Sequence, residues 1–481
     1  MESWPFIILN MRKKAKKQNV RAKQYDLIII GAGSAGFAAA EVASSEGAKV
    51  CLVEKGKLGG ECPNWACVPT KALLQSAKMY HLAKNNLDDF GVYASSVRFS
   101  FARIMARKDA VVKAITGDGQ KMQKLADKFG IDVVHGTASF VDSHTIQAAG
   151  KKFKAKKIII ATGSNTYVPP IDGIESIDYL DYRAAVSLKR LPESIAIVGG
   201  GPVACEFATF FNLLGSKVTI LEISANILTR EDEDISKLAR EEMEKQGINI
   251  KTKTKTLSAK KEGRKLRIGY QTGSQPRQSI LAEKILFAAG KRANIADLQL
   301  KKAGIKIDAK DRLVLKDNLQ TSVAHIFAAG DVSGGLQFTH TAHNEGYIAA
   351  VNALAKTKRS FLKREGRVVP RVTFIDPEIA SVGMTTKEAT LKKKNFKVSI
   401  FPVGALGRSV TEGDRRGLIK IIVEKRTNLI LGAFMIGPHA GEVIHELALA
   451  MYANLKVKDL SDMMHAFPTF SEAVAAVASQ I

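Results

Sequence analysis

The sequence predicts an α/β protein, because the same order of strand, glycine-rich turn, helix and strand occurs twice along the chain. In the first copy, the apolar run at residues 25–30 (YDLIII) indicates a buried parallel strand, since such strands lack polar alternation. Gly31-x-Gly33-x-x-Gly36 then opens a helix, and residues 49–54 (KVCLVE) indicate the next strand, which ends in Glu54.

The second copy repeats this order. Residues 194–198 (SIAIV) form the first strand, Gly199-Gly200-Gly201-x-x-Ala204 forms the turn, and residues 217–222 (KVTILE) form the second strand, which ends in Glu222. In both copies the acidic residue lies 18 positions after the third small residue of the turn. One glycine pattern alone is weak evidence, whereas two with matched acids in the same context are strong.

Each copy has the chemistry of a dinucleotide-binding unit. The glycines let backbone N–H groups approach a pyrophosphate, the helix dipole stabilises its charge, and the acid accepts hydrogen bonds from a ribose. Two copies therefore predict two bound dinucleotides. The fold class that follows is α/β, with two Rossmann-like domains and a C-terminal α+β domain.

The chain is too long for one core, since domains hold about 150 residues each. We expect a basic tail at 1–24, the first unit at 25–175, the second at 176–296, a return to the first at 297–363, and a third domain at 364–481. Residues 157–164 and 281–290 indicate the closing strands of the two units. Residues 326–332 end in Gly330-Asp331, which is either a plain turn or a return to the first cofactor, and a helix is predicted at 341–355. The third domain holds no nucleotide motif, so packing or oligomerisation is its expected role.

Composition describes a protein of a reducing compartment, with 46% hydrophobic and 25% charged residues and four cysteines. No apolar run reaches the roughly 18 to 20 residues of a membrane-spanning helix, and we expect a cytoplasmic location. The N-terminal tail has neither the order of a secretory signal nor the Arg and Ser content of a mitochondrial presequence, and Met11 is an alternative start.

The formal net charge of +25 is carried mostly by lysine clusters that indicate a solvated surface. Neither interleaved aromatic residues nor a reader motif points to specific nucleic-acid binding. Weak contact with anionic membranes stays open as an alternative.

Two cysteines follow closely on the first unit, in the segment GGECPNWACVPTK that holds Cys62 and Cys67. This spacing is poor for zinc, and the other cysteines, Cys51 and Cys205, stand alone, so no resident metal site is expected. If the pair opens a helix, the helix N-terminus lowers a thiol pKa toward the reactive thiolate. Two thiols beside a redox cofactor favour electron transfer, and two buried cysteines without chemistry are the alternative.

Together these motifs resemble the class I pyridine nucleotide-disulfide oxidoreductases, the family of lipoamide dehydrogenase, glutathione reductase and mercuric reductase. The likeness runs from about Tyr25 to Ala478. It follows the family order of first fingerprint, C-x4-C with P-T-K behind it, A-T-G, second fingerprint, G-D and a C-terminal P-T-x-x-E. It implies an enzyme that passes electrons from NAD(P)H through FAD to the cysteine pair, with a homodimer built by the C-terminal domain.

The resemblance also implies which residues hold the cofactors. FAD would be held by Gly31, Gly33, Gly36, Glu54, Gly136, Thr162, Gly163, Gly330, Asp331 and Thr341, and the nicotinamide nucleotide by Gly199, Gly201, Ala204, Glu222 and Gly290. Glu222 favours NADH, because a carboxylate repels a 2′-phosphate. Ala204 in place of a glycine is often seen with NADPH, and Arg230 stands too far along the sequence to decide.

The same resemblance assigns catalytic roles. Cys67 corresponds to the thiolate against the flavin, and Cys62 to the exposed thiol that attacks the acceptor. Lys71 corresponds to the lysine near the flavin that pairs with a helix glutamate, here Glu206, although each could be an ordinary surface charge. Residues 339–341 open a helix whose backbone N–H groups stabilise the reduced flavin, whereas His340 and His343 are expected to be helix or interface residues.

One departure from the family pattern concerns acid-base catalysis. Disulfide-reducing members carry a histidine directly before the C-terminal Pro-Thr, oriented by a glutamate five residues later and used by the partner subunit. Here Phe467 takes that position and Glu472 has lost its partner. General acid-base catalysis contributes roughly 10²- to 10⁴-fold, so turnover of lipoamide or glutathione disulfide should be weak unless His465 substitutes.

An aromatic residue at this position resembles the mercuric reductases, because soft metal ions bind thiolates directly and need little proton transfer. Those enzymes add a cysteine pair near the C-terminus, which is not seen here. We expect a mercuric-reductase-like enzyme acting on a metal ion, a quinone or another small acceptor. The alternatives are a dihydrolipoyl dehydrogenase and, from another class, a non-catalytic FAD-bound redox sensor.

Overall fold

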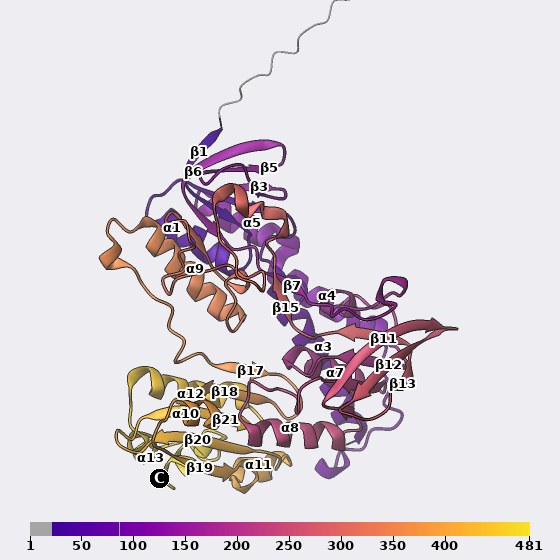
Figure 1. Ribbon diagram of the computed structural model, residues 1–481. Coiled ribbons are helices and arrows are strands. Elements are labelled where there is room, and N and C mark those ends of the chain that lie inside the picture. The colour runs from indigo at the N-terminus through magenta and orange to yellow at the C-terminus, as the bar shows by residue number, and fades with distance from the viewer. Residues whose placement is uncertain (1–21, 86) are drawn as a thin grey trace, which may run out of the picture.

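The computed structural model describes residues 22–85 and 87–481, and the strands within these ranges form five sheets (Figure 1). The first sheet holds the first glycine-rich turn. Its parallel core has the order β3, β2, β1, β6, with β16 also beside β6 and a β5–β4 hairpin at the far edge. The strands are β1 (Lys23–Ile30), β2 (Val50–Glu54), β3 (Asp132–His135), β4 (Ser139–Phe140), β5 (Thr145–Ala148), β6 (Lys151–Ile160) and β16 (Ile326–Ala328).

This sheet brings residues 326–328 back beside the first unit, about 165 positions after β6 ends. Helices α1 (Ser34–Ser45) and α9 (Thr339–Leu354) pack closely against each other, and both lie against strands of this sheet. The sequence predicted that the chain returns from the second unit to the first within residues 297–363. Through this return, the Gly330-Asp331 turn and the start of α9 lie at the sheet edge that also holds the first glycine turn.

The expected basic tail lies mostly outside the described residues. Strand β1 begins at Lys23, two residues earlier than the sequence indicated, because Lys23 and Gln24 pair with Phe153 and Lys154 of β6. Lys23 also forms an ion pair with Asp132 of β3. Polar residues at the start of a strand give no hydrophobic pattern in the sequence, so the true start of β1 is seen only from its pairing with β6.

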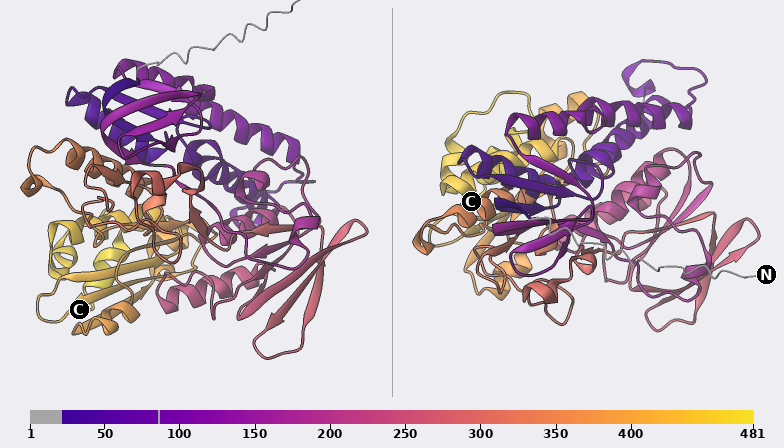
Figure 2. Two further views of the ribbon diagram at one scale, coloured as in Figure 1. Left: turned by 45° about the horizontal axis from the view of Figure 1, so that its top comes forward. Right: turned by 90° about the horizontal axis from the view of Figure 1, so that it is seen from above.

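The second unit repeats the first with a parallel sheet in the order β10, β9, β8, β14. A three-stranded antiparallel sheet, β11 to β13, packs on it and extends away from the body of the molecule (Figure 2). The elements are α6 (Tyr182–Ala185), β8 (Ser194–Val198), α7 (Pro202–Leu213), β9 (Lys217–Leu221), α8 (Glu233–Lys245), β10 (Asn249–Lys251), β11 (Thr254–Glu262), β12 (Lys265–Thr272), β13 (Gln278–Ala282) and β14 (Lys284–Phe287).

Two short strands, β7 (Ser164–Thr166) and β15 (Lys291–Ala293), pair where the chain passes between the two units. The cysteine segment forms α2 (Glu61–Asn64) and α3 (Cys67–Asn85), followed by α4 (Phe101–Thr116) and α5 (Gln120–Lys128). Helix α3 packs against α7, and one continuous core joins Leu73 and Leu74 of α3 to Phe207, Phe210 and Phe211 of α7. Each buried phenylalanine contributes about 1.5–3 kcal/mol, so the cysteine helix is anchored firmly to the second unit.

The third domain is an antiparallel sheet in the order β17, β18, β21, β20, β19, with helices packed on it. Its elements are β17 (Arg371–Thr373), β18 (Ile379–Gly383), α10 (Thr386–Leu391), β19 (Phe396–Pro402), α11 (Gly407–Glu412), β20 (Leu418–Glu424), β21 (Ile430–Ile436), α12 (Ala440–Ala453), α13 (Val457–Asp462) and α14 (Glu472–Ala478). Within the described ranges, no helix combines the length and the apolar character needed to cross a bilayer.

Candidate active site

One large cavity, of about 1700 Å³, runs between the first unit, the second unit and the start of the third domain. Gly31 and Gly33 of the first turn, Gly199 and Gly201 of the second, and both cysteines of the C-x4-C segment line it. A pocket for one ligand typically measures about 300–1,000 Å³. The volume therefore suits two ligands that meet near the cysteines.

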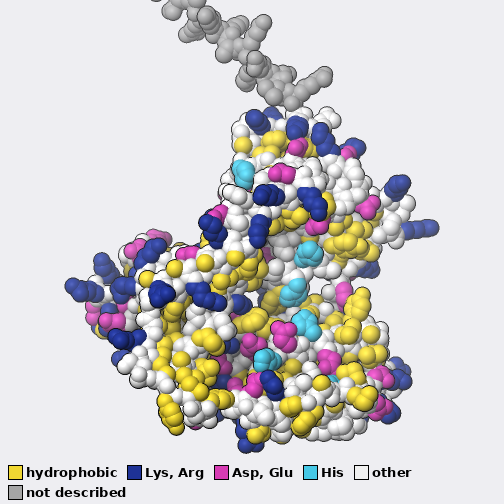
Figure 3. Space-filling view, turned by 180° about the vertical axis from the view of Figure 1, so that it is seen from behind, with side chains coloured by type: hydrophobic (Ala, Val, Ile, Leu, Met, Phe, Trp, Pro, Cys, Tyr) yellow, Lys and Arg dark blue, Asp and Glu magenta, His cyan; other side chains and the backbone are white. Residues whose placement is uncertain are grey.

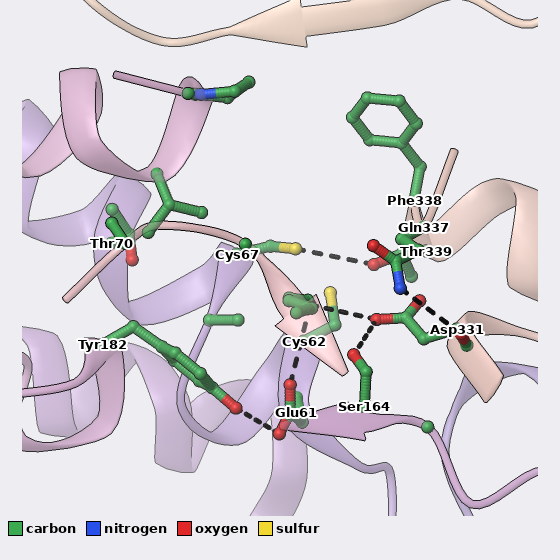
Figure 4. Close-up of a pocket in the computed structure, with 18 of the residues that line it drawn as sticks. Glu61, Cys62, Cys67, Thr70, Ser164, Tyr182, Asp331, Gln337, Phe338 and Thr339 are labelled. Atoms are coloured by element: carbon green, nitrogen blue, oxygen red, sulfur yellow. Dashed lines mark hydrogen bonds and ion pairs between the residues drawn. The ribbon is translucent and has the colours of Figure 1, made fainter. Parts of the chain in front are cut away.

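The two cysteines lie at the starts of successive helices (Figure 4). Cys62 is the second residue of α2 and Cys67 is the first residue of α3. Both thiols are partly buried and unbridged, and Cys67 Sγ lies 3.5 Å from Thr339 Oγ1 at the start of α9. The helix start that the sequence left conditional is thus present at Cys67.

The two thiols differ in acidity. A hydrogen bond from Cys62, assisted by Thr339 and the nearby charge of Lys71, outweighs burial and lowers the pKa of Cys67 to about 6. The same hydrogen bond, together with burial, raises the pKa of Cys62. At neutral pH the reduced pair therefore holds a thiolate at Cys67 and a thiol at Cys62.

Lys71 of α3 reaches Glu206 of α7 across the interface between these helices. Lys71 Nζ donates to both Glu206 carboxylate oxygens, at 2.9 and 2.7 Å, and Glu206 is only 5% exposed. The Phe374 backbone N–H also donates to Glu206, and Lys71 Nζ lies 4.6 Å from the centre of the Phe374 ring. A buried carboxylate that accepts three hydrogen bonds from two donor groups is not an ordinary helix-surface charge.

The first glycine turn fits a dinucleotide such as FAD. A Cβ at Gly31 would collide with the Ala161 carbonyl, and one at Gly36 with the Gly31 carbonyl, so only glycine allows this close backbone approach. Glu54 at the end of β2 accepts hydrogen bonds from the Ala32 N–H at 2.7 Å and the Gly56 N–H at 2.6 Å.

The segment beside Gly31 also presents polar groups to the cavity. Thr162 and Gly163 line the cavity, and the Thr162 hydroxyl is buried without a hydrogen-bond partner among the described residues. Gly136 lines a small side cavity that also borders Gly31, Glu54 and Thr162. An unsatisfied buried hydroxyl is costly, so a bound group that completes its hydrogen bonds is the simplest explanation.

Asp331 lies at the junction of the first unit and the returning chain. Its Oδ2 accepts hydrogen bonds from Ser164 Oγ at 2.7 Å and from Lys291 Nζ at 3.0 Å (Figure 4). The turn before it is held by Glu345 of α9, which accepts hydrogen bonds from the Gly330 N–H and the Ser333 hydroxyl. The Gly-Asp turn is therefore built into the cavity wall and is not a plain surface turn.

Sequence reasoning missed Lys291 and Glu345, although Lys291 directly follows Gly290 in a motif that it used. Burial alone would lower the pKa of Lys291, but the charge of Asp331 and its hydrogen bond raise it. Lys291 thus stays protonated in the cavity wall, with Glu61 3.8 Å away.

A second missed group surrounds Glu61, the residue before Cys62. The hydroxyl of Tyr182 and the guanidinium of Arg183 both donate to Glu61 Oε1, and Arg183 also lies over the Trp65 ring. Because Tyr182 is more than 100 positions from Glu61, no local pattern could have shown this contact. It fixes α2 against α6 of the second unit.

The second glycine turn makes the same kind of close backbone approach as the first, and Gly290 also lines the cavity. A Cβ at Gly199 would collide with the Ala288 carbonyl. Glu222 lines the cavity just after β9, and its Oε1 accepts a hydrogen bond from the Ser224 N–H at 2.6 Å. Ala204 is fully buried in the packing of α7 and does not line the cavity.

The start of α9 contributes unequally to the site. Thr339 and His340 line the cavity, whereas the Thr341 hydroxyl exchanges hydrogen bonds with the backbone of Phe338 and caps the helix. His445 of α12 also lines the cavity. Several histidine side chains gather beside the recess on the rear face of the molecule, while Lys and Arg are spread over that face (Figure 3).

The C-terminal segment presents Phe467 to solvent, with 78% of the residue exposed. The His465 side chain is only 6% exposed, with Nε2 2.9 Å from Glu446 Oε1 and Nδ1 3.1 Å from the Met463 carbonyl. Glu472 accepts a hydrogen bond from the Thr469 N–H. His465 is thus held within its own subunit, and Glu472 stabilises the turn before α14.

Comparison with known proteins agrees with this geometry. The family model described as pyridine nucleotide-disulphide oxidoreductase matches residues 25–346, and the model for the dimerisation domain of the same family matches residues 369–478. A mercuric reductase from Staphylococcus aureus is 36% identical over 452 residues, which cover 94% of this chain and 81% of that protein. A dihydrolipoyl dehydrogenase from Thermus scotoductus is 36% identical over 464 residues, which cover 95% of this chain and 98% of that protein.

A solved structure has the same fold. The Cu(II) complex of the HOCl-induced flavoprotein disulfide reductase RclA from Escherichia coli matches with a TM-score of 0.84 at 31% identity, over 95% of this chain and all of that one. The family matches cover both glycine turns, the cysteine pair and the C-terminal domain. The chain therefore belongs to the pyridine nucleotide-disulphide oxidoreductases, a family of enzymes whose members bind FAD and NAD(P)H.

Proposed function

We propose that this protein is a dimeric NAD(P)H oxidoreductase that uses FAD and the Cys62–Cys67 pair to reduce an acceptor that needs no catalytic histidine. The observation that carries the proposal is the environment of Phe467. An exposed aromatic ring replaces the acid-base histidine, and the nearest alternative, His465, is buried and bonded to Glu446.

The residues around the pair suit a two-step relay. Bound FAD supplies the two-electron chemistry between the nicotinamide and the cysteines. A Cys62–Cys67 disulfide that takes up two electrons and one proton becomes a Cys67 thiolate and a Cys62 thiol. The low pKa of Cys67 and the raised pKa of Cys62 place the proton on Cys62, which faces the acceptor in this proposal.

A soft metal ion is the acceptor class that these residues suit best. Thiolates bind such ions directly, so no leaving group has to be protonated. One Hg(II), or two Cu(II), would take the two electrons while the disulfide re-forms and the Cys62 proton is released. Support comes from two similar proteins, one named a mercuric reductase and one solved as a Cu(II) complex.

A small quinone is a second acceptor of the same kind, since it takes electrons without a mixed disulfide. A dihydrolipoyl dehydrogenase is the alternative enzyme, favoured by the similarity to the Thermus scotoductus protein over nearly its whole length. It would require proton transfer at a position where Phe467 offers none.

Anaerobic reduction with NADH tests the proposed role of the cysteines. We expect the long-wavelength absorbance of a thiolate in contact with the flavin. The Cys67→Ser variant should lose it, and the Cys62→Ser variant should show it even before NADH is added. Cys51→Ala, which removes a buried thiol outside the cavity, is the matched control. Reduction without this absorbance in the unaltered protein would rule out the relay.

A further inference from the structure

The first sheet has a lysine-rich edge at the end opposite to its glycine turn. The parallel strands β1, β2, β3 and β6 run in the same direction, so all four begin at this edge. It lies at the top of the molecule in Figure 1, far from the third domain. The exposed lysines there, called the basic edge below, are Lys23, Lys49, Lys128, Lys151, Lys152, Lys154 and Lys156.

Nearby acids neutralise only part of this charge. Lys23 is paired with Asp132 at 2.7 Å, and Lys156 with Asp26 at 2.8 Å. Within the part of the chain that the structure describes, the other lysines of the basic edge form no ion pair. The acids at this edge are Asp26, Glu46, Asp127 and Asp132. Because the lysines outnumber these acids, the basic edge keeps a net positive charge.

Three of the lysines stand in a row on β6. Side chains at every second position face the same side of a strand, so Lys152, Lys154 and Lys156 share one exposed face while the residues between them are buried. At about 3.3 Å per residue, the row is roughly 13 Å long. Its cross-strand neighbours include Gln147 beside Lys152 and Gln24 beside Lys154, neither of which is charged.

The chain that precedes β1 adds charge to the same edge. Because Gln24 of β1 pairs with Lys154, the described chain begins directly beside the lysine row. Residues 10–21 lie outside the described residues, and their sequence contains six basic side chains and no acidic one. Before them, residues 4–9 (WPFIIL) are all apolar. A folded basic surface and a basic segment are therefore continuous along the chain.

An anionic membrane matches this combination better than a nucleic acid does. Each lysine close to an anionic leaflet strengthens binding about fivefold, and an apolar run with Trp and Phe can enter the lipid interface. Nucleic-acid binding would favour exposed aromatic rings that stack on bases. Tyr25, the aromatic residue of β1, is only 4% exposed, and the Nζ atoms of Lys23 and Lys49 lie over its ring.

We propose that the basic edge docks on an anionic phospholipid surface, together with the basic residues at 12–21 and the apolar run at 4–9. The first glycine turn lies at the opposite edge of the sheet, so docking leaves the large cavity accessible to its ligands. The inference concerns a surface outside the active site and does not depend on the proposed function.

Vesicle sedimentation with the FAD-loaded full-length protein tests this docking. We expect binding to vesicles of equal parts phosphatidylserine and phosphatidylcholine, little binding to phosphatidylcholine alone, and weaker binding as salt screens the charges. Lys151→Gln/Lys152→Gln/Lys154→Gln should bind the anionic vesicles at least tenfold more weakly. These lysines are exposed and unpaired among the described residues, so flavin absorbance and the urea midpoint should stay unchanged.

A matched variant separates the basic edge from overall charge. Lys261→Gln/Arg264→Gln/Lys265→Gln removes three exposed cations from the β11–β12 hairpin of the second unit and should bind the anionic vesicles within twofold of the unaltered protein. Equal weakening in this variant and in the β6 variant would overturn the proposal, because net charge alone would then explain the binding.

A third variant tests the segment before β1. Arg12→Gln/Lys13→Gln/Lys14→Gln should also weaken binding to the anionic vesicles by tenfold or more. Equal binding of the unaltered protein to neutral and anionic vesicles, or no binding to either, would contradict the proposal. Tighter binding to double-stranded DNA than to the anionic vesicles would assign the basic edge to nucleic acid instead.

Discussion

In the proposed function, Phe467 limits which acceptors the site can reduce. Its ring is exposed and has no group that accepts or donates a proton, while Glu472, placed to orient a histidine, is bonded to the Thr469 N–H. The cysteine side of the reaction has no comparable defect, since Cys67 has Thr339 and Lys71 nearby. The cysteine pair therefore has neighbouring groups that support electron transfer, whereas position 467 has no group that can transfer a proton.

Replacing Phe467 by histidine should restore proton transfer. We expect Phe467→His to raise kcat/KM for lipoamide by about 10²- to 10⁴-fold, measured by NADH oxidation at saturating nucleotide. Phe467→Gln is the matched control, because it is polar and cannot titrate near neutral pH. An equal gain in both variants, or no gain in either, would show that Phe467 does not limit disulfide reduction.

The acidity of Cys67 gives a second prediction at this scale. Because its pKa is lowered to about 6, the thiolate is present above that pH and is lost as pH falls through it. The long-wavelength absorbance of the Cys62→Ser variant is expected to persist at neutral pH and to disappear in acid. Adding Lys71→Met removes the nearby positive charge and should raise the pKa of Cys67 relative to the Cys62→Ser variant. A midpoint near the ordinary thiol value of about 8.5 would mean that Thr339, Lys71 and the serine hydroxyl at position 62 do not stabilise the thiolate.

For some secondary structure elements, the sequence alone was sufficient to predict their bounds. The strand at Ser194–Val198 has the bounds that the pattern indicated, and the helix expected at 341–355 is α9, which begins two residues earlier at Thr339. These elements carry strong local signals, namely apolar runs bounded by glycine turns. The contacts of Glu61 with Tyr182, and of Lys291 with Asp331, depend on how distant segments pack, so no local pattern could predict them.

A buried ion pair joins Asp232, the residue directly before α8, to β20 and gives a prediction at the element scale. Lys420 Nζ donates to Asp232 Oδ1 at 2.7 Å, and the two side chains are 4% and 2% exposed. Burial acts to raise the pKa of Asp232, but the hydrogen bonds from Lys420 and Thr386 outweigh it and lower the pKa. The stability from this pair is therefore present at neutral pH and is lost as pH falls below the usual Asp range.

Lys420→Met should lower the free energy of unfolding by about 3–5 kcal/mol, because Asp232 is left buried without its cation. The double variant Asp232→Asn/Lys420→Met should recover part of this loss, and Lys397→Met, at a more accessible site on β19, is the control for a lysine change. Urea unfolding at pH 7 measures all three. A loss under 1 kcal/mol for Lys420→Met would mean that the pair contributes no more than a surface ion pair.

At the scale of the whole molecule, the third domain exposes an apolar surface that a second copy would cover. Leu449 and Tyr452 of α12 are 64% and 70% exposed, and Met464 is 96% exposed near Phe467. The family match of this region is a dimerisation domain. A dimer would explain the exposure of these side chains, and in the proposed function Phe467 of each subunit faces the other subunit's cysteines.

Charge placed on this surface should separate the subunits. We expect light scattering to give twice the 52.1 kDa of the chain for the unaltered protein and a single chain mass for Leu449→Glu/Tyr452→Glu. Leu391→Glu, at an exposed position on α10, is the control and should remain dimeric. If the unaltered protein is monomeric at micromolar concentration, Phe467 cannot lie at an active site shared between two subunits.

We propose that this enzyme reduces acceptors that need no histidine in preference to disulfides, and a comparison of steady-state turnover with different acceptors tests this preference. With NADH as the electron donor, the assay would compare five acceptors: Hg(II), Cu(II), quinones, lipoamide and glutathione disulfide. Cys62→Ser and Cys67→Ser are the controls. We predict cysteine-dependent turnover with at least one metal ion or quinone, and kcat/KM for both disulfides lower by two or more decades. Turnover of lipoamide as fast as, or faster than, that of every other acceptor would contradict the proposed preference.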